Sequence, residues 1–161
     1  MTTALRPVSS SEESPPASVS TLPAPLPAAR LMAHAAAWLI LLGLLTGGYV
    51  AAAMTGKVPA DPQAALASHL NALLGAFLLL GVAWTLPMLR YGPRGQHRLA
   101  WAFIVANFAN WSVTAVKAWL RVAGVDAIGE PVNDAVFGVL TLFVVLPALG
   151  AAAAWVYGFR R

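Results

Sequence analysis

The sequence contains no cysteine and few charged residues. The lack of cysteine excludes disulfides, thiolate-ligated haem and cysteine-held iron–sulfur clusters, so any metal would need histidine, carboxylate or amide ligands. Charged residues make up 10% of the chain, whereas soluble domains carry about 25%. Because 59% of the residues are hydrophobic, the composition indicates a protein whose solvent is the lipid bilayer.

Acidic residues are outnumbered by basic ones, which gives a formal net charge of +4. The basic residues stand in the gaps between apolar runs, and they form no stripe interleaved with aromatic residues. This distribution argues against nucleic acid as a partner and is typical of residues that orient membrane helices.

Long apolar runs dominate the chain after residue 30. They cover about residues 31–54, 64–88, 99–121 and 132–159, and each exceeds the ~20 residues needed to cross ~30 Å of hydrocarbon. The short gaps are rich in Gly, Pro and charged residues, so successive helices are expected to be antiparallel neighbours. The sequence therefore predicts an all-α, four-helix transmembrane bundle over residues 31–161.

Residues 1–30 have a different composition. Six of the twelve prolines and six serines lie there, and such a stretch buries too little apolar area to offset its chain entropy. We predict a disordered tail. It does not resemble a cleavable signal peptide, because the first apolar run begins only after Arg30.

The basic residues divide unequally between the two predicted membrane faces. Because positive residues are retained on the cytoplasmic side, the asymmetry predicts a multi-pass protein of a bacterial-type inner membrane with both termini cytoplasmic. The larger group is Arg6, Arg30, Arg90, Arg94, Arg98, Arg160 and Arg161, and the smaller is Lys57, Lys117 and Arg121.

Polar residues inside a membrane helix are costly unless partnered, so each is a candidate for function. The spacing i, i+3, i+4, i+7 and i+14 relates Asn107, Asn110, Trp111, Thr114 and Arg121, which places them on one helix face. Such a stripe faces protein, water or a ligand. Two asparagines beside an aromatic residue favour a pocket over simple interhelical hydrogen bonding.

The histidines lie at different predicted depths. His34 is near the cytoplasmic face and His69 is near the opposite face. Their depths in the membrane differ by about 20 Å, at ~1.5 Å per residue. His97 falls in a predicted loop. His34 and His69 of one chain therefore cannot ligate one metal. If iron is bound, His69 is its expected protein ligand; the alternative is a hydrogen bond from His69 to a backbone carbonyl. A single histidine with an open opposite face suits Lewis-acid chemistry or small-ligand binding.

Three segments carry a family resemblance: LLGLLTG at 41–47, ASHLN at 67–71 and ANFANW at 106–111. In order and placement they resemble the hydroxylaminobenzene mutases, which are in turn similar to the styrene oxide isomerases. The resemblance covers about residues 31–161.

The resemblance implies a homotrimer that binds ferric haem b between subunits, with His69 as the axial iron ligand. It implies that the iron acts as a Lewis acid on a small aromatic substrate in a redox-neutral intramolecular rearrangement. For a mutase the reaction is N-aryl hydroxylamine to 2-aminophenol; the alternative is a styrene oxide isomerase-like conversion of an epoxide to an aldehyde.

The predicted site follows from the stripe and the resemblance. Its catalytic candidates are Asn71, Asn107 and Asn110, and its cofactor-binding candidates are His69, Trp111, Lys117 and Arg121. Lys117 and Arg121 either snorkel to the membrane surface or pair with haem propionates or acidic loop residues.

This sequence departs from the family patterns on the substrate side. Asn71 and Gly75 stand where the mutases have Glu and Asn, and Asn107 and Ala115 stand where the epoxide isomerases have an acid and a tyrosine. Two other classes of function remain open: a non-catalytic haem-binding or sensing membrane protein, and a structural subunit or small transporter without haem. Transporters usually show inverted repeats and broken helices, and this sequence has no such signature beyond Pro87 and Pro147.

Overall fold

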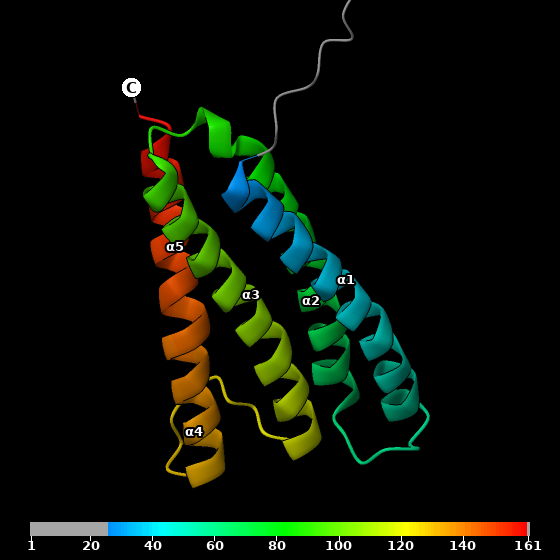
Figure 1. The fold of residues 1–161 in the computed structure, drawn as a ribbon. Helices are drawn as coiled ribbons and strands as arrows, with labels where there is room; N and C mark the ends of the chain where they lie inside the picture. The colour runs from blue at the N-terminus through cyan, green and yellow to red at the C-terminus, as the bar shows by residue number, and fades with distance from the viewer. Residues whose placement is uncertain (1–25, 161) are drawn as a thin grey trace, which may run out of the picture.

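The computed structural model describes residues 26–160, which form a bundle of antiparallel helices (Figure 1). The predicted disorder of residues 1–25 lies outside the described residues. The elements are α1 (Pro27–Met54), α2 (Pro62–Thr85) with the 3₁₀ turn η1 (Leu86–Met88), α3 (Pro93–Leu120), α4 (Pro131–Leu140), the π-helical segment η2 (Thr141–Val145) and α5 (Leu146–Gly158). The last three run on as one helix. Four helices are long and apolar enough to cross a membrane, which confirms the predicted fold class.

A proline stands at the first position of every membrane-spanning helix: Pro27, Pro62, Pro93 and Pro131. Proline suits this position because its fixed φ is helical and its missing N–H would have no partner there anyway. The helices therefore begin at these prolines and not where the apolar runs begin. Residues 27–30, predicted to belong to the disordered tail, are helical.

The prediction that His97 lies in a loop is wrong. It lies in α3, which begins at Pro93, six residues before the predicted start at residue 99. The six residues are too polar for hydrocarbon, but outside it helix formation does not require an apolar sequence, and Gln and Arg are good helix formers.

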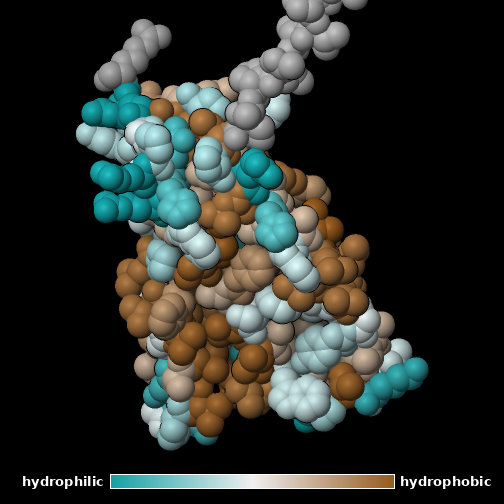
Figure 2. Space-filling model, in the orientation of Figure 1, coloured by the Kyte–Doolittle hydropathy of each residue, from teal (hydrophilic) through white to brown (hydrophobic). Residues whose placement is uncertain are grey.

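Helices α1, α2 and α3 pack against one another, whereas the continuous helix α4–η2–α5 packs chiefly against α3 (Figure 1). The largest fully buried side chains include Met32, Leu39, Leu79 and Leu86, from α1, α2 and η1. Many other apolar side chains point outward; the exposed fraction is 66% for Leu45. On the face that Figure 2 shows, a wide apolar band between the two ends is therefore available to lipid or to another chain.

The two ends of the bundle differ in charge. Both described termini lie at one end (Figure 1), together with Arg30, Arg90, Arg94, Arg98 and Arg160. Hydrophilic side chains gather at this end in Figure 2. We propose that it faces the cytoplasm.

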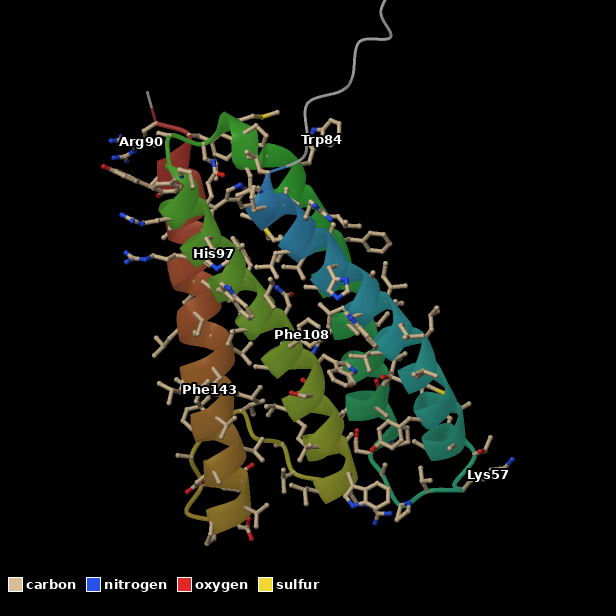
Figure 3. All side chains as sticks on the ribbon, viewed as in Figure 1. Lys57, Trp84, Arg90, His97, Phe108 and Phe143 are labelled. Atoms are coloured by element: carbon tan, nitrogen blue, oxygen red, sulfur yellow. The ribbon has the colours of Figure 1, made fainter. Side chains whose placement is uncertain are left out.

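Reporter fusions test this orientation. Fusions after residue 161 and within residues 89–92 are expected to report cytoplasm, because the positive-inside rule retains the arginine-bearing end. A fusion beside Lys57, at the other end (Figure 3), is the matched control and is expected to report the opposite side. The reverse pattern would overturn the proposed orientation.

Candidate functional site

His69 lies in α2 and its imidazole contacts α1. The ring atom Nδ1 is 2.7 Å from the carbonyl oxygen of Gly43, and the side chain is partly buried. The hydrogen bond to a backbone carbonyl, predicted as the alternative to iron binding, is therefore present; iron binding stays a prediction for the other ring nitrogen. A carbonyl oxygen can only accept a hydrogen bond, so Nδ1 carries the proton and is the donor. The other ring nitrogen, Nε2, then presents a lone pair. This is the tautomer in which a histidine binds a metal, with its second nitrogen held by a backbone carbonyl.

Two glycines of α1 lie against α2 around His69. A Cβ added at Gly43 would stand 2.9 Å from Leu73 Cδ2 and 3.1 Å from Ala72 Cβ, both on α2. A Cβ at Gly47 would stand 3.5 Å from His69 Cε1. Gly43 therefore allows α1 and α2 to approach closely, and this approach brings the Gly43 carbonyl to the imidazole.

We predict that Gly43→Ala destabilises the bundle by roughly 1–3 kcal/mol, because the added methyl group forces α1 away from α2. Gly48→Ala is the matched control, since Gly48 lies on the same helix and a Cβ there meets nothing within 4 Å. Thermal unfolding of both variants in detergent measures the difference. Equal melting temperatures would show that the helices do not depend on this contact.

The predicted polar stripe of α3 meets α2. Asn71 Nδ2 donates to Asn110 Oδ1 and to Thr114 Oγ1, each at 3.2 Å. One amide thus joins two members of the stripe across the helix interface. Because hydrogen bonds between membrane helices satisfy groups that lipid cannot, this network fixes how α2 and α3 face each other.

Trp111 extends the network to α1. Its indole N–H donates to Thr46 Oγ1 at 3.0 Å, and that hydroxyl donates to the Leu42 carbonyl at 2.6 Å. The carbonyl of Trp111 accepts from Ser68 Oγ at 3.2 Å. Trp111 therefore holds three helices together near the predicted site.

Asn107 is used differently. Its Nδ2 donates to the Phe103 carbonyl of its own helix at 2.7 Å. Its Oδ1 lies only 2.6 Å from where a Cβ on Gly75 would stand. The absence of a side chain at residue 75 thus leaves the space that the Asn107 amide fills.

The asparagine network and His69 lie on different sides of α2. His69 and Asn71 are two residues apart, which is about 200° around an ideal helix. Accordingly His69 contacts α1, whereas Asn71 contacts α3. Within one chain the structure brings Asn71, Asn110 and Trp111 into one network, but it does not bring them to the imidazole.

Lys117 and Arg121 lie at the end of α3. Lys117 Nζ donates to the Ala123 carbonyl at 2.9 Å, and Arg121 Nε donates to the Pro59 carbonyl at 3.1 Å. Arg121 ends the helix in the left-handed region, with φ of 56°. Both side chains therefore fix the loops at this end of the bundle.

The other two histidines are exposed and already occupied. Trp38 Nε1 donates to His34 Nε2 at 3.1 Å, and Trp101 Nε1 donates to His97 Nε2 at 3.0 Å. His34 precedes the two glycines beside His69 by 9 and 13 residues, roughly 14–20 Å along α1. This separation agrees with the predicted difference in depth between His34 and His69.

The donor set limits what metal the chain can hold. Among residues 26–160 there is no group of three or more His, Cys, Asp or Glu side chains that could hold a metal ion. A haem supplies four nitrogen ligands of its own and needs one axial histidine from the protein. The imidazole of His69, with its proton on Nδ1 and its lone pair on Nε2, fits that requirement.

Sequence reasoning missed two hydroxyl groups of α1. Thr46 receives the indole of Trp111, and Tyr49 Oη is buried without a hydrogen-bond partner in the described part of the chain. Both lie within an apolar run, next to Gly47 and Gly48. The only available signal was their polarity inside a membrane span.

Comparison with known proteins places the chain in a family. The sequence model of the styrene oxide isomerase family matches residues 28–160. A hydroxylaminobenzene mutase, HabB of Ectopseudomonas oleovorans, is 37% identical over 101 residues, which cover 61% of this chain and 56% of the relative. The chain thus matches little more than half the length of this relative. No solved structure matches it. Because the family match extends over all four membrane spans, this chain belongs to the styrene oxide isomerase family.

Proposed function

We propose that the protein is a haem-dependent membrane isomerase that rearranges a small aromatic substrate without net oxidation or reduction. The observation that carries this proposal is the partly buried His69, whose Nδ1–H···O bond to Gly43 leaves Nε2 to bind iron. Membership of the styrene oxide isomerase family supports the same reaction class.

His69 would hold ferric haem b, and Gly43 would orient the imidazole by its carbonyl. When bound, the haem would supply an electron-pair acceptor for the substrate oxygen. A hydrogen bond from the second ring nitrogen to a carbonyl raises the basicity of a ligating histidine and fixes its tautomer. The chain's own contribution at this position is therefore an oriented, electron-rich ligand inside the membrane.

The substrate we favour is an N-aryl hydroxylamine, converted to a 2-aminophenol. This choice rests on the mutase relative, which is 37% identical over its matched part. A second reaction, the conversion of an aryl epoxide to an aldehyde, is favoured by the longer family match over residues 28–160. Both substrates are small and apolar enough to enter from the bilayer.

We propose a homotrimer whose sites lie between chains. His69 contacts α1 while Asn71 contacts α3, so a pocket containing both the imidazole and an amide needs walls from two subunits. In such a pocket Asn71, Asn107 and Asn110 would orient the substrate, while Trp111, Lys117 and Arg121 would contact the cofactor. Lys117 and Arg121 would pair with its propionates through the donors that their bonds to Ala123 and Pro59 leave free.

The test of the cofactor is an absorption spectrum of the detergent-purified protein. A Soret band with about one haem per chain is expected, and mass measurement in the same sample should give three times the 16.8 kDa of the chain. The proposal would be contradicted if folded protein, produced with haem supplied, showed no Soret band. A Soret band without turnover would favour a haem-binding sensor.

A further inference from the structure

A pair of arginines flanks one tyrosine where α5 ends. The guanidinium carbons of Arg90 and Arg160 lie 5.1 and 5.4 Å from the centroid of the Tyr157 ring, within cation–π distance. The sum of these distances means that the two cations are at most 10.5 Å apart. The backbone N–H of Arg90 also donates to the Gly158 carbonyl at 2.9 Å, which ties the α2–α3 connection to the end of α5.

This end of the bundle carries no acidic residue in the described chain. The four acidic residues between 26 and 160 all lie at the opposite end, at the start of α2, in the α3–α4 loop and in the first turn of α4; they are Asp61, Asp126, Glu130 and Asp134. Arg90 and Arg160 thus place two positive charges on one tyrosine, and among residues 26–160 no carboxylate side chain lies at this end. Figure 3 shows Arg90 at this end. An anion is the complementary ligand.

An apolar groove of about 520 Å³ begins beside these arginines and runs along α5. It is lined by Leu149, Ala152, Ala153, Val156, Tyr157 and Arg160. Their spacing of three and four residues places them on one outward face of the helix. Tyr157 and Arg160 form the mouth, and the apolar residues extend from it toward the centre of the membrane span.

This groove has a charged residue in its lining, whereas a groove at the other end of the bundle has none. A groove of about 220 Å³ between α3 and α4 is lined by Ser112, Val113, Val116, Ala135, Val136 and Val139, without a charged residue. A groove that only packs against lipid tails needs no cation. The α5 groove joins an apolar helix face to Arg160 at the end of the bundle that carries the arginines.

We propose that this groove binds an anionic phospholipid, with its phosphate at the surface formed by Arg90, Tyr157 and Arg160 and one acyl chain along α5. The charge complementarity at the mouth selects this occupant over a neutral lipid or a second copy of the chain. Guanidinium groups pair with phosphate oxygens in a planar, bidentate geometry. The bound lipid joins the α2–α3 connection to the end of the last helix.

Native mass spectrometry of the full chain tests the proposal. The protein is released from nanodiscs of phosphatidylcholine containing phosphatidylglycerol, and retained lipids are counted. Arg90→Gln combined with Arg160→Gln is expected to weaken phosphatidylglycerol binding by about 30-fold, since each basic group near the surface contributes a roughly 5-fold effect. Lys57→Gln combined with Arg94→Gln removes the same charge away from Tyr157 and is expected to weaken binding clearly less than the Arg90 and Arg160 variant, because it leaves the proposed phosphate contacts intact.

A third variant tests the groove itself and does not depend on the folding of the double arginine variant. Ala153→Leu fills the groove while leaving both arginines, so phosphatidylglycerol retention is expected to fall although the surface charge is unchanged. The proposal would be overturned if the protein retained phosphatidylcholine and phosphatidylglycerol equally, or if both charge variants lost the same amount of phosphatidylglycerol. Displacement of the lipid by inorganic phosphate alone would also overturn it. A change of oligomeric state in Ala153→Leu without lipid loss would also overturn it, in favour of a subunit interface.

Discussion

His69→Ala is expected to lose haem almost completely. Removing an outer-shell partner of a metal ligand already costs about 10- to 100-fold in affinity, so removing the ligand itself should cost more than about 100-fold. The haem-to-protein ratio of the purified variant, measured by absorbance after extraction, reports the loss. In His69→Gly the missing side chain leaves space for a free imidazole molecule. Added imidazole is therefore expected to restore the haem absorption band in this variant.

His34→Ala and His97→Ala are the matched controls. Each of these histidines is exposed, and its Nε2 already accepts an indole N–H, from Trp38 and Trp101 respectively. Both variants are therefore expected to keep the haem content of the unmodified protein. Haem retained at full occupancy in His69→Ala, or lost equally in all three variants, would contradict the assignment of His69 as the ligand.

The fold was predictable because membrane spans are set by length and hydrophobicity. The four predicted runs correspond to the four helices, but their starts do not. Hydropathy marks where the hydrocarbon begins, whereas the helices begin at prolines outside it, as at Pro93 of α3. The π-helical turn at Thr141–Val145 was not predicted. It precedes Pro147, whose missing N–H interrupts the hydrogen-bond ladder of the last helix.

The site was predictable in its parts but not in its arrangement. Periodicity correctly placed Asn110, Trp111 and Thr114 on one face of α3, because spacing alone fixes the face of a helix. It could not show that Asn71 would reach two of them, or that Gly43 would accept from His69. Those contacts depend on how closely and at what rotation the helices pack, and a single sequence does not encode that directly.

The second large effect concerns turnover. Phenylhydroxylamine and 2-aminophenol contain the same atoms, so their interconversion needs neither NADH nor oxygen. Protein containing one haem per chain is therefore expected to convert phenylhydroxylamine fully under argon without any added reductant or oxidant. The turnover rate of His69→Ala is expected to be more than about 100-fold lower, equivalent to roughly 2.7 kcal/mol or more of lost transition-state stabilisation. His34→Ala should stay near the rate of the unmodified protein.

The measurement that tests the account most directly is the same anaerobic reaction carried out in ¹⁸O-labelled water, with the product analysed by chromatography and mass spectrometry. If the rearrangement is intramolecular, the hydroxyl oxygen moves from nitrogen to the ring, and 2-aminophenol forms with no label above natural abundance. Labelled 2-aminophenol would show addition of solvent water. No conversion of phenylhydroxylamine or styrene oxide by haem-containing protein would contradict the proposed isomerase.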